Sequence, residues 1–243
     1  MPAPDPSAIL DVWERGLRQP LQRQVVALLA AVTGSSEADI VALPLGARDA
    51  ILLDLREQLF GIDLATVTAC PSCSEQLEAG FSLDQVRTPA LPAGEADLIA
   101  MVAGREIRFR PPATADLLAI PAGADAAAVR TILLERCVTA RDTDGTRLAP
   151  DALPASAIPP IIEGMARADP QAVVELRLTC AACGHGFVAI FDIAAFLMRE
   201  IHGWARQMLR DIDSLARAYG WREADILALS PTRRQVYVEM AAT

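Results

Sequence analysis

Apolar residues recur every three or four positions along most of this chain, and they alternate with polar residues only in short stretches. The first pattern is typical of amphipathic helices and the second of half-buried strands. Helices are predicted near both ends, at Ser7–Leu17, Pro20–Thr33, Glu37–Leu43, Ala47–Phe60, Ile193–Ala218 and Glu223–Leu229, with a last one starting at Ser230-Pro231. Strands are predicted at Ile62–Thr68, Leu77–Leu83, Val173–Thr179 and Phe187–Ile193, with a hairpin over Asp97–Arg110.

The central part of the chain mixes shorter helices with proline-rich stretches. Thr114 is predicted to cap a helix over Ala115–Ile120, and a longer helix is expected over Asp125–Thr139. Residues 149–160 have the composition of a linker, followed by a helix over Ile161–Arg167. This part either forms a binding surface or fills space between the flanking elements.

Two CxxC motifs, Cys70–Cys73 and Cys180–Cys183, lie 110 residues apart, and each leads into one of the predicted strands. Aligned on their cysteines, the two stretches keep the same hydrophobic phase, with Leu77 on Phe187 and Phe81 on Phe191. Four thiolates in two such pairs are the donor set of a tetrahedral structural zinc. We therefore predict that Cys70, Cys73, Cys180 and Cys183 bind Zn²⁺ in a zinc ribbon with two halves from distant parts of the chain.

These elements predict an α+β fold that is mainly α, with helical N- and C-terminal arms joined by the small β zinc ribbon. A central insert of a hairpin and helices separates the two halves of the ribbon. The expected divisions are residues 1–61 for the N-terminal arm, 62–86 and 172–192 for the halves of the ribbon, 87–171 for the insert and 193–243 for the C-terminal arm.

A second internal match relates the two arms. Gly34 followed by Glu37–Leu43 recurs as Gly220 followed by Glu223–Leu229, and five of the six positions from Glu37 to Ala42 are identical. The match is either a true repeat or convergence on the sequence rules for helix caps and turns. A true repeat would give two related arms held together by one metal.

Composition and charge narrow the classes of function. The 243 residues carry a formal charge of −9, and the 22 basic residues are all arginine, so catalysis by a lysine nucleophile or P-loop lysine is excluded. An acidic chain argues against a nucleic-acid binder, which usually has a basic face. The start lacks the pattern of a signal peptide, and the apolar runs are too short to span a membrane. We expect the protein in the cytoplasm, free or within an assembled particle.

The sequence offers little for catalysis. Four cysteines fill a tetrahedral zinc shell and leave no position for water. The chain has two histidines: His185 is an alternative ligand to one sulfur, and His202 is expected beside the apolar seam of the long helix. The fifth cysteine, Cys137, is expected as a buried thiol, and neither CxxC has the βαβ setting of a redox motif. We predict that the protein is not an enzyme.

The residues also resemble a known family. The stretch from Leu215 through Trp221 and Glu223–Leu229 to Tyr237, the second CxxC with Phe191–Leu197, and Arg108–Leu117 are similar to zinc-ribbon baseplate-assembly proteins of contractile phage tails and related injection systems. The resemblance implies a structural or assembly role, with baseplate, hub or tube proteins as partners.

Candidate partner-binding residues are Trp221, Arg233, Arg234 and Tyr237, whereas Trp204 on the seam of the long helix is expected in the core. The alternative is a zinc-ribbon adaptor in a transcription or other nucleic-acid complex. Arg233, Arg234 and Gln235 of the last helix are also candidates for reading DNA bases, but the apolar residues of that helix favour contact with a protein. Salt-dependent binding of nucleic acid would separate the two hypotheses.

Overall fold

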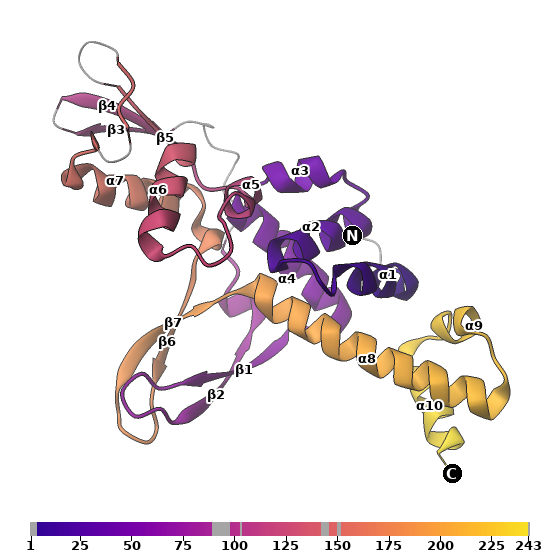
Figure 1. The fold of residues 1–243 in the computed structure, drawn as a ribbon. Coiled ribbons are helices and arrows are strands. Elements are labelled where there is room, and N and C mark those ends of the chain that lie inside the picture. Colours follow the sequence, from indigo (N-terminus) through magenta and orange to yellow (C-terminus); the bar gives the residue numbers. More distant parts are fainter. Residues whose placement is uncertain (1–3, 89–97, 103, 142–145, 150–151, 243) are drawn as a thin grey trace. The chain divides into compact units, whose positions relative to one another are not determined.

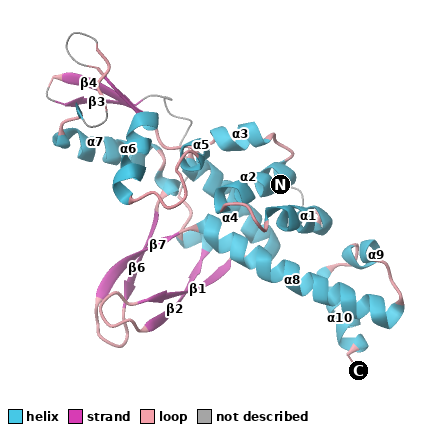
Figure 2. Cartoon of the chain, in the orientation of Figure 1, coloured by secondary structure: helices cyan, strands magenta, loops and turns pink. Residues whose placement is uncertain are grey.

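The computed structural model describes residues 4–88, 98–102, 104–141, 146–149 and 152–242. Residues 97 and 103 of the hairpin predicted over Asp97–Arg110 lie outside the described residues. The fold is mainly helical with several small sheets, as the sequence predicted (Figure 2). Two compact units share the chain: residues 1–37 with 194–243, and residues 38–193.

The first unit is helical. It contains α1 (Pro6–Gly16), α2 (Leu21–Thr33), α8 (Ile193–Tyr219, which begins one residue before the unit), α9 (Glu223–Leu227) and α10 (Pro231–Ala241) (Figure 1). Asp5 caps α1 by accepting a hydrogen bond from the Ser7 N–H. Leu10 of α1 packs with Ala205 and Met208 of α8 in a core cluster, and Trp204 lies against this cluster. The predicted apolar seam of the long helix therefore faces the core of this unit.

The second unit contains the three small sheets. Its helices are α3 (Glu37–Ala42), α4 (Leu45–Phe60), α5 (Thr114–Leu118), α6 (Ala126–Cys137) and α7 (Ile158–Ala168). The antiparallel pairs β1 (Asp63–Ala69) with β2 (Gln76–Ser82), and β6 (Val174–Thr179) with β7 (Gly186–Phe191), form two hairpins. A three-stranded sheet joins β3 (Leu98–Val102), β4 (Arg105–Phe109) and β5 (Val138–Ala140).

Three details of the central insert correct the sequence-based prediction. Val138 to Ala140 forms strand β5 beside β4 instead of continuing the helix, because Val138 and Ala140 join the core around Ile107 and Phe109. Helix α7 begins at Ile158, within the stretch read as a linker, because prolines are tolerated in the first turn of a helix. Ala113, and not Thr114, is the N-cap of α5.

The reason for the third correction is the side chain of Asp116. Its carboxylate accepts a hydrogen bond from the Ala113 N–H at 2.8 Å, so α5 is capped from inside the helix. The same fully buried carboxylate accepts hydrogen bonds from Arg110 at 2.7 and 3.0 Å and from Arg136 at 2.8 Å. Asp116 thereby ties α5 to the residue after β4 and to the end of α6. Arg110 and Asp116 both belong to the stretch Arg108–Leu117 that carried part of the family resemblance.

The internal match between the arms is also a match of conformation. Gly34 after α2 and Gly220 after α8 both have left-handed backbone, with φ of 72° and 66°. The short helix that follows buries Ile40 in one arm and Ile226 in the other. Helices α4 and α10 start at equivalent positions, and each buries an arginine, Arg48 or Arg234. The two segments share their pattern of elements and of buried positions.

Candidate metal centre

Each CxxC motif forms a turn held by backbone hydrogen bonds. The Cys70 N–H donates to the Glu75 carbonyl at 2.8 Å, and the Cys180 N–H donates to the His185 carbonyl at 2.9 Å. The N–H four residues after each first cysteine, on Ser74 and Gly184, donates back to that cysteine's carbonyl. Ser74 and Gly184 both have left-handed backbone, with φ of 63° and 73°. The two turns are therefore equivalent in conformation as well as in sequence.

The two hairpins place these turns beside each other, and Figure 1 shows β1–β2 next to β6–β7. Alternate residues of each strand face the partner hairpin and are more buried than their neighbours. Phe81 of β2 meets Phe191 of β7 edge to face, with ring centroids 5.2 Å apart. The aromatic contact lies at the ends of the hairpins away from the cysteine turns, so the hairpins are held at both ends.

The four predicted ligands come together at the turns. The Sγ atoms of Cys70 and Cys183 lie 3.8 Å apart, and those of Cys73 and Cys180 lie 3.7 Å apart. All four sulfurs lie within 4.8 Å of one another. A zinc ion with four bonds of about 2.3 Å holds its sulfurs about 3.8 Å apart, so the group fits tetrahedral zinc. Cys70 and Cys180 are buried, whereas Cys73 and Cys183 are exposed.

The crowding of four thiols affects their acidity. Burial opposes ionisation of Cys70, but the N–H groups of Cys73 and Ser72, together with the neighbouring thiols, lower its pKa to about 7. At Cys73 the Glu75 N–H favours the thiolate, yet the sulfur of Cys183, burial, and the sulfurs of Cys180 and Cys70 raise its pKa to about 12. Ionising one thiol therefore hinders ionisation of the next, and a bound cation would remove this repulsion.

The other cysteine and the two histidines lie outside this group. His185 stacks on Phe187, with ring centroids 6.3 Å apart, and it is not among the clustered ligand atoms. Cys137 is buried, and its thiol donates to Asp116 at 3.5 Å. Burial and the charge of Asp116 raise the pKa of Cys137 to about 11, so the thiol is poorly reactive. His202 Nδ1 accepts a hydrogen bond from the Trp13 indole at 3.1 Å.

The candidate partner residues lie near one another in the C-terminal arm. Trp221 stacks on Tyr219, and its ring meets Tyr237 edge to face at 4.9 Å between centroids. Arg233 is exposed, but Arg234 is buried and its Nε lies 3.4 Å from Asp211. The structure thus brings the two aromatic candidates together and places Arg234 in the interior of the arm. Their role in binding a partner stays a prediction.

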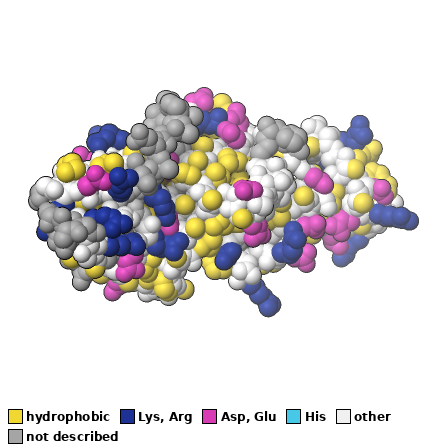
Figure 3. All heavy atoms as spheres, turned by 90° about the horizontal axis from the view of Figure 1, so that it is seen from above, with side chains coloured by type: hydrophobic (Ala, Val, Ile, Leu, Met, Phe, Trp, Pro, Cys, Tyr) yellow, Lys and Arg dark blue, Asp and Glu magenta, His cyan; other side chains and the backbone are white. Residues whose placement is uncertain are grey.

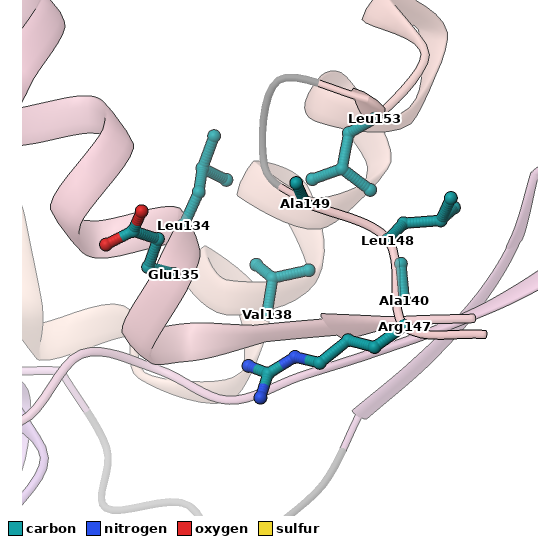
Figure 4. Close-up of a pocket in the computed structure, with 8 residues that line it drawn as sticks. All are labelled: Leu134, Glu135, Val138, Ala140, Arg147, Leu148, Ala149 and Leu153. Carbon is teal, nitrogen blue, oxygen red and sulfur yellow. The ribbon is translucent and has the colours of Figure 1, made fainter.

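The central insert also contains a pocket that sequence reasoning did not find. It has a volume of about 250 Å³ and is lined by the end of α6, β5, residues 147–149 and Leu153 (Figure 4). Its lining is mostly apolar, and Glu135 and Arg147 are its charged members. The apolar residues belong to the core pattern of the insert, so the sequence held no separate signal for a cavity.

The hairpin pair with its four clustered cysteines defines a class of protein, a mainly helical chain built around a candidate zinc ribbon. The family described as T4 bacteriophage base plate protein matches residues 16–198, which is well over half of the chain. The chain belongs to this family. The matched region includes both CxxC turns and the insert, and it ends within α8, before α9 and α10. Comparison with curated proteins and with solved structures gave no match.

Family membership agrees with the resemblance to phage baseplate proteins and does not favour the nucleic-acid alternative. Figure 3 shows acidic and arginine side chains interspersed over the face that it draws.

Within the described residues, no helix is both long enough and apolar enough to cross a membrane.

Proposed function

We propose that this protein is a non-enzymatic structural or assembly component of a baseplate in a contractile, phage-like tail. In this proposal a structural zinc bound by Cys70, Cys73, Cys180 and Cys183 fixes the two hairpins to each other. The observation that carries it is the group of four sulfurs at tetrahedral spacing, within 4.8 Å of one another. Membership in the base plate family supports a role in a baseplate.

A structural role for the zinc is supported by the ligand set. Four protein sulfurs complete a tetrahedral shell, whereas catalytic zinc sites usually keep one position for water or substrate. The turns that carry the cysteines join paired strands instead of opening a helix, which is unlike the usual setting of a redox-active CxxC. Zinc here would stabilise the fold by joining the two hairpins at the ends opposite the contact of Phe81 with Phe191.

The helical arms would then carry the contacts to other baseplate, hub or tube proteins. Trp221 and Tyr237 support this role, because clustered aromatic residues on an exposed terminal arm often anchor a partner. Co-purification of the full chain with such proteins, and its loss in a Trp221→Ala and Tyr237→Ala variant that keeps its zinc, would test this part.

The zinc is tested by metal analysis of the purified chain and of Cys70→Ser and Cys180→Ser variants. We expect one zinc per chain, and we expect each variant to lose the metal and much of its stability, because binding energy at a structural site is folding energy. Cys137→Ala is the matched control, since Cys137 is a buried cysteine outside the site. Unchanged stability of the serine variants with no metal present would contradict the proposal.

A further inference from the structure

The outer face of the second hairpin is unusually apolar for an exposed strand pair. Val188 and Ile190 on β7 are 52% and 64% exposed, and Val173, just before β6, is 57% exposed. Arg177 lies opposite Val188 and Glu175 lies opposite Ile190 in the strand register, so the same face also carries one charge of each sign. Single exposed apolar residues are ordinary, but several β-branched residues gathered on one face of a hairpin indicate a contact surface.

The outer face of the first hairpin has the opposite character. Its side chains are small at Ala65, Ala69 and Gly80, and Val67 is 60% exposed. Glu78 lies opposite Val67 in the register. A Cβ placed on Gly80 would meet only the Leu64 carbonyl oxygen, at 3.9 Å, so the space above this glycine is open. This face is flat and acidic, since the sequence has no arginine between Arg56 and Arg87.

The two outer faces complement each other residue by residue. The alignment of the hairpins puts the row of Val67 and Glu78 at the same level as the row of Arg177 and Val188. If β1 of one face lies over β7 of the other, Val67 meets Val188 and Glu78 meets Arg177. Ile190 then lies over Ala65 and Glu175 lies over Gly80, where the small residues leave room for both side chains.

We propose that the outer face of β6–β7 in one copy of this chain packs on the outer face of β1–β2 in a second copy. Within one chain the inner faces of these hairpins already pack together, so the contact adds a further sheet layer of the same kind. Because the two surfaces differ, the contact is head-to-tail, and repeated contacts close a ring or extend a row of copies. The inference goes beyond the proposed function and does not depend on which tail protein the chain binds.

The small area of the two faces limits the expected affinity of the contact between copies. Two strands of six or seven residues present a face of roughly 20 by 10 Å, far below the ~800 Å² per partner of a stable interface. The net charge of −9 on each copy adds a repulsion that salt weakens. The contact is therefore weak between free copies and becomes populated where many copies are held close together.

The test measures self-association of the full, zinc-loaded chain from about 10 μM to about 1 mM by sedimentation and by methyl NMR, a range suited to a weak contact. Signals of Val67, Val188 and Ile190 should shift with concentration. Signals of Ile99 and Ile162, which are 52% and 60% exposed elsewhere in the same unit, should not shift. Ile190→Asp should abolish association, and Ile99→Asp should leave it unchanged.

Charge reversal makes the test specific to this pair of faces. Arg177→Glu and Glu78→Arg should each weaken association by about tenfold, because each places like charges opposite each other. An equimolar mixture of the two variants should associate as well as the wild type, since each variant can supply the complement of the other. Failure of the mixture to recover, or a chain that stays monomeric at the highest concentration, would overturn the inference. A monomer with its full zinc content would leave the proposed function intact.

Discussion

Asp116 shows how one buried charge can organise a region of this protein. Burial alone would raise the pKa of its carboxyl group, but the hydrogen bonds and charge of Arg110, the Ala113 N–H and Arg136 outweigh burial and hold the pKa well below its usual range. Both arginines remain partly exposed at 37% and 40% of their side chains. The pair of ion pairs therefore keeps contact with water while fixing the start of α5 between β4 and α6.

Replacing this carboxylate should destabilise the folded protein. For Asp116→Asn we expect a loss of about 2–4 kcal/mol in the free energy of unfolding at pH 7, because two arginines lose their buried partner. Glu163→Gln, at a carboxylate with 69% of its side chain exposed, is the control and should change stability by less than about 0.5 kcal/mol. Urea unfolding measures both.

The same substitution should change how the stability of the protein depends on pH. The folded pKa of Asp116 is lowered, so its contribution is present above the unfolded pKa of about 3.9 and is lost as the pH falls toward the folded pKa. The difference between wild type and Asp116→Asn should shrink between about pH 5 and pH 3. A difference that is constant over this range would contradict the assigned cause.

At the scale of elements, periodicity and cap residues predicted most helices and strands near both ends of the chain. The clustering of the four sulfurs was also expected, because two CxxC motifs with matched strands restrict where four sulfurs can lie. The misses lie in the insert, where tertiary contacts decide. Val138 lies at the end of a helical pattern, yet pairing with Phe109 makes it a strand residue. Outside the insert, the burial of Arg234, a candidate partner-binding residue, beside Asp211 of α8 depends on packing that periodicity does not encode.

The CxxC turns allow a prediction for a single element. Gly184 has left-handed backbone with nothing near its missing Cβ, so Gly184→Ala costs backbone strain of about 1–2 kcal/mol without a clash. Gly186, in the same hairpin, also has open space but no positive φ, and Gly186→Ala should not destabilise the protein. Thermal unfolding with zinc present would compare them. Equal effects at the two glycines would show that the turn is not strained as described.

At the scale of the whole molecule, the division into two compact units predicts two responses to metal removal. All four cysteines belong to the unit of residues 38–193, whereas α1 and α2 belong to the other unit. After chelation of the proposed zinc, amides of β1, β2, β6 and β7 should exchange with deuterium at least about tenfold faster, because their hairpins would lose the proposed cross-link. Amides of α1 and α2 should keep their exchange rates. Hydrogen-exchange mass spectrometry measures both units, and an equal rise in exchange rate in the two units would contradict the prediction.

The separation of the two CxxC turns also has a consequence during synthesis. A ribosome makes the chain from one end at about 5–20 residues per second, so the 110 residues between Cys70 and Cys180 take roughly 5–20 s. For that time the first turn offers half a ligand set, while the insert emerges and begins to fold. The tetrahedral site can form only after the second turn has left the ribosome. The proposed zinc can therefore bind only at a late stage, after the residues between the two turns have been synthesised.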